Sequence, residues 1–249
     1  MTQSRRYDDP CGIARALDVI GDRWALLVVR ELIFGPKRFA QLRAGLHPIS
    51  PNVLSQRLRD LESGGVIRRD ELAPPASVPV YELTGRGRAL EPVLLALGRW
   101  GSQEPITTAR ELTPDALLVA LKTAFDPSAA AAAGDNVTYA LEIGGDVIAI
   151  TVAGSSLGVT RGRAGRPAAG FRGDVATMRA VLFGRETIAH AERAGRLTVT
   201  GDRVLAERFT RMFPVRRPQS AQAAATTKTR AHERDGLCHR GRQNGSMGS

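Results

Sequence analysis

The sequence predicts an α+β protein in two parts: an N-terminal group of short helices with one hairpin, then an α+β part in which helices pack on an antiparallel sheet. Three observations predict this arrangement. Apolar residues recur at spacings of three and four through much of residues 13–62, as in helices that bury one face. Two extended runs follow at 66–71 and 79–83. From residue 112, a helical pattern leads into alternating strand patterns.

Charge and composition set the expected organisation. The 249 residues carry 35 Lys and Arg against 25 Asp and Glu, a net charge of +10. Half of this excess lies in residues 214–249, which lack periodicity and are predicted to be a disordered basic tail. We expect one domain at 1–101 and another at 112–213, since domains commonly span about 100–200 residues. A basic balance favours nucleic acid, but the two domains are only mildly basic, so charge alone does not identify a DNA-binding protein.

The expected compartment follows from apolar runs and cysteines. No run approaches the roughly 18 consecutive apolar residues of a membrane helix, and the polar first ten residues do not resemble a secretory signal. The two cysteines, Cys11 and Cys238, lie near opposite ends of the chain, which fits neither a disulfide framework nor a metal-ligand spacing. We therefore expect a cytoplasmic protein without membrane association, metal or cofactor.

The N-terminal helices are predicted from their breaks. Gly21 interrupts the helical pattern of residues 13–32, as a boundary between two helices would, and the Gly-Pro pair at 35–36 ends the pattern. A short helix is expected around 39–46, followed by a turn at 47–49.

The next helix carries a strong start signal. Ser50 is a predicted N-cap and Pro51 occupies the first helical position. The two extended runs then form a hairpin with a stiff, exposed, proline-containing tip. Thr84 is expected to cap a helix over 85–100, with a kink at Pro92.

The second part alternates helical and strand patterns. Thr113 is a predicted N-cap for a helix over 112–125, and Gly144-Gly145 is a hairpin signal. Residues 161–170 are basic and glycine-rich, which predicts a loop. The other predicted elements are strands at 137–143, 146–152, 156–161 and 196–200, and helices at 174–183, 187–193 and 202–213.

The helix that begins at Ser50 has one apolar and one polar face. Successive helical residues turn by about 100°, so Leu54, Leu58 and Leu61 share a face. Side chains that hydrogen-bond bases and phosphates lie opposite. Alone, this pattern also fits any amphipathic helix with a solvated polar face. The order helix, short helix, turn, capped helix, hairpin and helix favours a winged helix-turn-helix that binds duplex DNA. The predicted DNA-binding residues are Lys37, Arg38, Ser50, Asn52, Ser55, Gln56, Arg57, Arg59, Arg68 and Arg69.

The basic residues outside that polar face have expected roles of their own. Lys37 and Arg38 precede the short helix, where the first helix of such a motif crosses the DNA backbone. Arg57 lies at the edge of the leucine face, within reach of a phosphate or of an acidic residue in its own domain. Arg68 and Arg69 lie at the base of the hairpin.

A set of residues recurs in a fixed order and spacing through residues 11–100. They are Cys11, Leu17, Gly21, Asp22, Arg23, Trp24, Leu26, Leu27, Arg30, Glu31, Leu32, Arg38, Phe39, Leu42, Ile49, Ser50, Leu54, Ser55, Gln56, Arg57, Leu58, Leu61, Glu62, Tyr81, Glu82, Leu83, Thr84, Gly87, Leu90 and Trp100. In this set, residues 11–100 resemble the HxlR-type transcription regulators of bacteria, a winged-helix family related in plan to the MarR group. The resemblance departs at Gly12, where the family usually has proline, and at the acidic Asp22 before Arg23. It implies a homodimer built from the first and last helices that binds an inverted repeat in double-stranded DNA.

A homodimer is also expected from the residues themselves. Residues 12–19 and a stripe near residue 100 are more apolar than one small domain can cover, and exposed apolar stripes mark association surfaces. The stripe consists of Leu90, Val93, Leu94, Leu97 and Trp100.

The second part resembles the sterol-carrier-protein type 2-like fold, through the glycine pair at 144–145, the helix from Asp174 and the run from Gly195 to Phe213. Such domains enclose an apolar tunnel, so the resemblance implies a small hydrophobic effector that modulates DNA affinity. The alternative is an apolar core without a cavity. The predicted pocket wall is Leu117, Leu121, Phe125, Phe171, Met178 and Leu182.

The sequence offers three alternatives to a ligand-responsive, sequence-specific regulator: a redox sensor, a hydrolase and a lipid carrier. Cys11, with Arg15 one turn later, is a candidate redox sensor, although a lone cysteine there is more often a small buried residue. Residues 154–158 match the nucleophile-elbow pattern, with Asp174 and His190 in hydrolase order, but a strand follows them instead of a helix, so we expect no enzyme. The remaining alternative is a lipid carrier with vestigial DNA binding.

Overall fold

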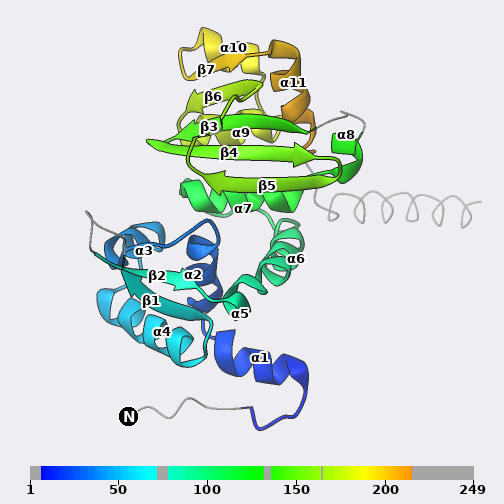
Figure 1. Cartoon of the computed structure of the whole chain (residues 1–249). Coiled ribbons are helices and arrows are strands. Elements are labelled where there is room, and N and C mark those ends of the chain that lie inside the picture. The colour runs from blue at the N-terminus through cyan, green and yellow to red at the C-terminus, as the bar shows by residue number, and fades with distance from the viewer. Residues whose placement is uncertain (1–6, 72–77, 132–135, 164, 215–249) are drawn as a thin grey trace, which may run out of the picture. The chain divides into compact units, whose positions relative to one another are not determined.

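The computed structural model describes residues 7–71, 78–131, 136–163 and 165–214, and Figure 1 shows the order of their elements. The described residues up to 99 and those from 109 onward form one compact unit, and residues 100–108 fall in another. The predicted basic tail beyond residue 214 and the hairpin tip at 72–77 lie outside the described ranges. Within those ranges, no helix has both the length and the apolar character needed to cross a bilayer.

Between residue 7 and the hairpin, the structure has four helices, as the breaks in the sequence pattern predict. They are α1 (Gly12–Ile20), α2 (Ala25–Leu32), α3 (Phe39–Gly45) and α4 (Pro51–Ser63). The predicted separation at Gly21 is confirmed. The Gly21 N–H donates to the Leu17 carbonyl, and a side chain at residue 21 would collide with the same oxygen. The core that these helices share includes Val28, Leu42, Leu54, Leu58 and Leu61.

The predicted hairpin is confirmed. Strands β1 (Ile67–Glu71) and β2 (Pro79–Leu83) pair antiparallel along their whole length. We call these two strands the wing. The predicted cap after it is also present, because Thr84 Oγ1 accepts a hydrogen bond of 3.1 Å from the Gly87 N–H in α5 (Gly85–Arg88).

The helix expected over residues 85–100 is in fact two helices. α5 ends at Arg88, and α6 (Glu91–Gly101) begins after Leu90. The predicted kink at Pro92 is therefore wrong. Proline lacks an N–H group and is tolerated in the first turn of a helix, where that donor has no intrahelical partner. The chain breaks before Pro92 and places it in the first turn of α6.

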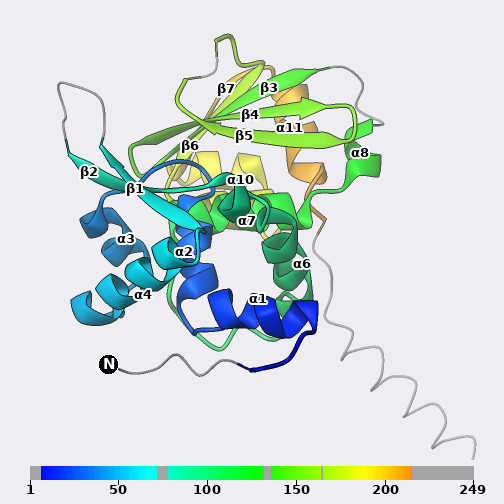
Figure 2. The same ribbon diagram turned by 60° about the horizontal axis from the view of Figure 1, so that its bottom comes forward.

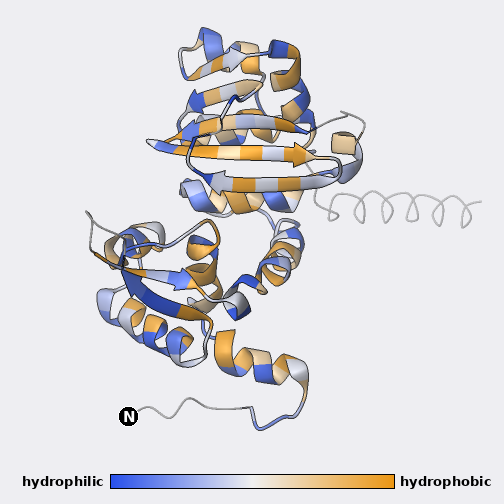
Figure 3. Ribbon diagram, in the orientation of Figure 1, coloured by the Kyte–Doolittle hydropathy of each residue, from blue (hydrophilic) through white to orange (hydrophobic). Residues whose placement is uncertain are grey.

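The second part contains a five-stranded sheet in the order β5-β4-β3-β6-β7. Strands β3 (Val137–Ile143), β4 (Asp146–Ala153) and β5 (Ser156–Arg161) form the predicted antiparallel hairpins. Figure 3 shows how strongly apolar β4 is. The edge on the other side is β7 (Leu197–Gly201), antiparallel to its neighbour β6 (Ala169–Gly173).

The predicted antiparallel pairing does not extend to the whole sheet, because β6 runs parallel to β3. The start of β6 also falls in the segment predicted as a loop. Its sequence, Ala-Gly-Phe-Arg-Gly, has no β-branched residue and therefore gives a weak strand signal. The glycines have a packing role: a side chain at Gly170 would approach Thr200 Oγ1 to 2.7 Å.

Helices cover one face of this sheet. α7 (Pro114–Ala124), α9 (Val175–Leu182) and α11 (Arg203–Arg211) lie on the same side of it (Figure 1, Figure 2). The short helices α8 (Pro127–Ala131) and α10 (Ile188–Arg193) complete this part. In the core between the sheet and the helices, the rings of Tyr139 and Phe209 stack with centroids 4.3 Å apart.

Candidate nucleic-acid interface

Helix α4 separates its apolar and polar residues as the sequence predicts. Leu54, Leu58 and Leu61 are buried in the helical core. On the opposite side, Asn52, Gln56 and Arg59 are exposed, and Ser55 is half-buried. Amide and guanidinium groups of this kind form paired hydrogen bonds with base edges in the major groove.

The polar side chains of α4 hold one another in place. Gln56 Nε2 donates to Asp60 Oδ1 at 2.7 Å, and Arg59 Nη2 donates to Gln56 Oε1 at 2.5 Å. Exposed hydrogen bonds of this type exchange readily with other partners, because water already competes for them. The exposed face of α4 therefore presents Arg59 beside Gln56, and both side chains can exchange these hydrogen bonds for bonds to a ligand.

The start of α4 is fixed by its predicted cap. Ser50 Oγ accepts a hydrogen bond of 3.3 Å from the Val53 N–H, and Pro51 takes the first helical position. This cap sets where the exposed side chains of the first turn begin. Ser50 therefore positions α4, and its hydroxyl is engaged with the backbone.

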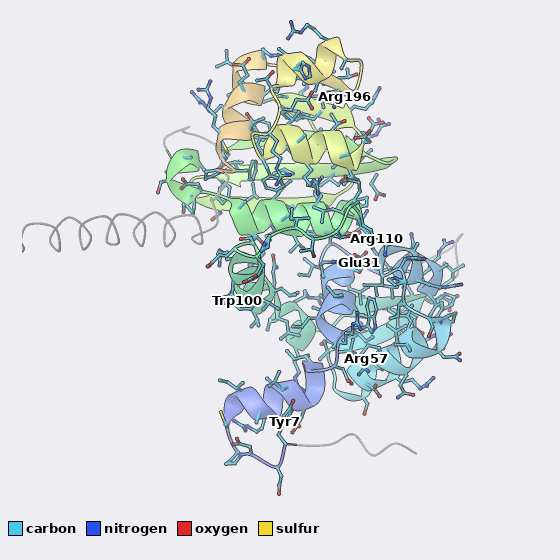
Figure 4. All side chains as sticks on the ribbon, turned by 180° about the vertical axis from the view of Figure 1, so that it is seen from behind. Tyr7, Glu31, Arg57, Trp100, Arg110 and Arg196 are labelled. Carbon is cyan, nitrogen blue, oxygen red and sulfur yellow. The ribbon has the colours of Figure 1, made fainter. Side chains whose placement is uncertain are left out.

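Arg57 contacts acids of its own part of the chain. Its guanidinium forms an ion pair with Asp22, which precedes α2. It forms a second one with Asp60, with Nη1 and Oδ2 3.1 Å apart. Figure 4 shows Arg57 on α4. Of the two predicted partners, a phosphate or an acid of the same domain, the structure shows the acid. Arg57 thus ties α4 to the connection between α1 and α2.

The structure places Lys37 away from the exposed cations. The residue is only 9% exposed, and its Nζ donates to Glu31 Oε2 at 2.6 Å and pairs with Asp115. The expectation that Lys37 contacts the DNA backbone is corrected, because its ammonium group is already enclosed by two carboxylates. Its neighbour Arg38, by contrast, is exposed at the start of α3.

The wing presents two arginines with different surroundings. Arg68 is exposed but pairs across the hairpin with Glu82 and, at 3.6 Å, with Asp70. Arg69 is also exposed, and the structure gives it no ion pair among the described residues. Figure 3 shows the strongly hydrophilic character of β1. Arg69 is therefore the wing cation with the least competition for an external phosphate.

The predicted pocket wall is packed core in this structure. Leu117, Leu121, Phe171, Met178 and Leu182 are buried, and Phe125 packs partly buried against the same core. A hollow of about 660 Å³ lies instead among α9, α10 and α11, and another of about 260 Å³ lies between α1 and α5. None of the six predicted residues lines either hollow.

Cys11 is exposed at the start of α1, so the alternative that it is a small buried residue is wrong. Its backbone N–H donates to Asp9 Oδ1 at 2.8 Å. The other cysteine of the chain, Cys238, lies outside the described residues. Across the part of the chain that the structure describes, no group of three or more His, Cys, Asp or Glu residues is placed to hold a metal ion.

The sequence pattern that resembles a nucleophile elbow lies in a hairpin turn. β4 ends at Ala153 and β5 begins at Ser156, so Gly154 and Ser155 connect two paired strands. Gly154 has a φ of 56°, which suits glycine in a tight turn. The strand-turn-helix context of a hydrolase is absent at this point of the chain, as expected from the sequence.

Several large apolar side chains of α1 and α6 are exposed. Ile13 is 72% exposed, and Leu17, Val93, Leu97 and Trp100 are also exposed. Two members of the predicted association stripe differ: Leu94 is buried in the helical core and Leu90 packs partly buried against it. The exposed apolar residues are therefore fewer than the sequence pattern indicates, but they lie on both predicted segments.

Residues 19–107 match a family described as HxlR-like helix-turn-helix. YvaP, an uncharacterised HTH-type transcriptional regulator of Bacillus subtilis strain 168, is 39% identical over 90 residues, which span 36% of this chain and 82% of YvaP. YodB, an HTH-type transcriptional regulator of the same strain, is 34% identical over 98 residues, 39% of this chain and 88% of YodB. The structure of reduced YodB matches with a TM-score of 0.35 at 31% identity, over 38% of this chain and 94% of that one. Residues 108–249 lie outside the family match.

Proposed function

The chain belongs to the HxlR-like helix-turn-helix family of DNA-binding transcriptional regulators, and on that premise we propose that it reads a specific duplex DNA sequence through the outward face of α4. The observation that carries this proposal is the division of α4 into a buried leucine face and an exposed row of Asn52, Gln56 and Arg59. Helix-turn-helix proteins place such a row in the major groove.

Phosphate contacts are assigned to cations that the fold leaves available. Arg38 at the start of α3 and Arg69 on the wing are exposed, and they flank α4 in the helix-turn-helix plan. Phosphate contacts position a protein on the duplex without reading its sequence. We therefore assign base specificity to α4 and sequence-independent affinity to Arg38 and Arg69. Arg68 can add to this affinity once its ion pair with Glu82 is broken.

The experiment that tests this function is selection from a pool of random duplexes with the full chain. Enrichment of one motif supports the proposal, and the inverted repeat expected of a dimer would appear as two related half-sites. Failure to enrich any motif would overturn it. A lipid carrier with vestigial DNA binding predicts that failure, together with transfer of lipid between vesicles.

We also propose that two copies of the chain associate through α1 and α6. The support is the exposure of Ile13 and Leu17 on α1 and of Val93 and Leu97 on α6, since large apolar groups clustered at a surface favour association. A second copy is the occupant that the family plan requires, because an inverted repeat is bound by a twofold dimer.

A small hydrophobic effector in the second part remains part of the proposal. The predicted wall residues lie where α7 and α9 pack on the sheet, so a ligand there has to part these helices from the sheet. A ligand shifts DNA affinity only through different affinities for two conformations. Native mass spectrometry of full-length protein purified from its host tests this directly: a bound small molecule supports it, and consistently ligand-free protein that binds its DNA site argues against it.

Redox sensing through Cys11 is a second candidate, favoured by the exposure of that thiol. Oxidants attack accessible thiolates. If Cys11 is the sensor, diamide changes DNA binding of the native chain and leaves the Cys11→Ser variant unchanged. An equal response of both proteins would exclude this role.

A further inference from the structure

A cluster of buried charges joins α2, the connection to α3, and α7. Glu31 on α2 is 1% exposed and Asp115 in the first turn of α7 is 3% exposed. Lys37 lies between them and pairs with both carboxylates. Arg30 completes the cluster at Glu31, at 2.7 Å, and Arg161 of β5 completes it at Asp115, at 2.5 Å. Glu31 is labelled in Figure 4.

The groups of this cluster satisfy one another's hydrogen-bonding capacity. Burial alone raises the pKa of Glu31, but the ammonium of Lys37 and the guanidinium of Arg30 outweigh it and hold that pKa below its ordinary value. Glu31 Oε1 also accepts a hydrogen bond of 3.1 Å from Thr113 Oγ1. A buried charge that loses its partner is strongly destabilising. The three buried members, Glu31, Lys37 and Asp115, therefore depend on one another staying in place.

Lys37 connects this cluster to the wing through its backbone. Its N–H donates to the Tyr81 carbonyl at 3.0 Å, and the Tyr81 N–H donates back to the Lys37 carbonyl at 2.9 Å. Tyr81 is the middle residue of β2. One residue thus bonds to the wing by its main chain, and to α2 and α7 by its side chain.

The segment that precedes α7 contacts the turn before α4. Arg110 Nη1 donates to the His47 carbonyl at 2.8 Å, and Figure 4 labels this arginine. Phe34, in the connection between α2 and α3, packs in the core of the sheet and its helices. The elements proposed to meet DNA are therefore bonded to α7 and the segment before it at more than one point.

From these contacts we infer that Lys37 is a positioning residue. It holds the wing against α2 and makes the position of the wing depend on Asp115 of α7. This inference rests on the proposed function, because the wing matters only if it meets DNA, and it names how the second part acts on the first. α7 also carries Leu117 and Leu121 of the proposed effector wall. A displacement of α7 moves Asp115 and takes one carboxylate partner from Lys37. It also moves Thr113, which donates a hydrogen bond to Glu31. Both changes loosen the bridge from Lys37 to Tyr81.

Hydrogen exchange of the full-length protein tests the inference without DNA, so its failure is distinguishable from failure of the proposed function. Asp115→Asn keeps the shape of the side chain and removes its charge. We expect exchange to quicken by roughly tenfold in peptides that contain the Lys37 and Tyr81 amides, since local opening reports local stability. The β3–β4 amides should keep the exchange rates of the native protein. Glu142→Gln is the control. It makes the same change from carboxylate to amide in an ion pair outside the cluster, the pair of Glu142 on β3 with Arg172 on β6.

Two outcomes with the Asp115→Asn variant alone would overturn the inference. If exchange quickens only around residues 113–117, the cluster is a local contact of α7. If it quickens equally in β3 and β4, Asp115 serves general stability. Lys37→Met gives an independent check, since the double variant with Asp115→Asn should exchange no faster at Tyr81 than Lys37→Met alone. Additive effects of the two changes would show that they act separately.

Discussion

Arg69 is an exposed cation of the wing, without an ion pair among the described residues, and its expected partner is a DNA phosphate. Replacing it with alanine should weaken binding to all duplex sequences about equally and lower the slope of log affinity against log salt by about 1 for each protomer. Fluorescence anisotropy over a salt series measures both effects. Arg193→Ala, which removes an exposed arginine of α10, is the control. A change in sequence preference for Arg69→Ala would contradict the assignment.

Glu31 should make stability depend on pH. Its pKa is lowered in the folded protein, so its contribution is fully present above the ordinary carboxyl pKa and is lost as pH falls through the lowered value. At pH 7, Glu31→Gln should reduce the free energy of unfolding by about 3 kcal/mol, as expected when a buried pair is broken. Urea titrations in acid should show the two proteins converging. A difference that does not shrink with falling pH would refute the ionised pair.

The predictions for Ser50 and Lys37 show which roles of single residues can be predicted from sequence. The N-cap predicted at Ser50 is present, whereas the DNA-backbone contact expected of Lys37 is not supported. The cap by Ser50 depends on a backbone amide three residues away, so local pattern was enough to predict it. The burial of Lys37 depends on Asp115, which is 78 residues later, and no local pattern contains that pairing. The signal available in the sequence was Glu31, an acidic residue inside the apolar helix α2.

At the scale of elements, the start of α4 can be tested by its cap. Ser50→Ala removes the acceptor for the Val53 N–H and should cost about 1 kcal/mol of stability. Ser50→Asp should restore most of it, because aspartate caps helices comparably. Urea unfolding of the three proteins checks the order. Equal midpoints for Ser50→Ala and the native chain would show that the cap contributes nothing.

Elements with strong capping or periodicity were predicted, and those defined by tertiary contacts were not. Helix α4 and the hairpin of β3 and β4 follow from local signals. Strand β6 does not, because its five residues include two glycines and it is a strand only through pairing with β3 and β7. Its parallel pairing with β3 likewise depends on a connection whose path is not encoded locally.

At the scale of the whole molecule, the dimer can be separated from the fold. Leu97, on α6, is 46% exposed, and Val204, on α11, is 68% exposed. Leu97→Asp should convert a dimer into monomers and weaken binding to an inverted repeat, while Val204→Asp should change neither. Sedimentation velocity at micromolar concentration distinguishes the species. A native chain that sediments as a monomer there would end the dimer proposal.

The outward face of α4 is expected to carry the sequence information of this protein. Parallel selections from one random duplex pool, with the native chain and with Arg59→Ala, measure this. The variant should still enrich the motif but lose preference at one base pair of each half-site, at a cost of about 1–3 kcal/mol on the native site. An unchanged motif for Arg59→Ala, at unchanged affinity, would contradict it.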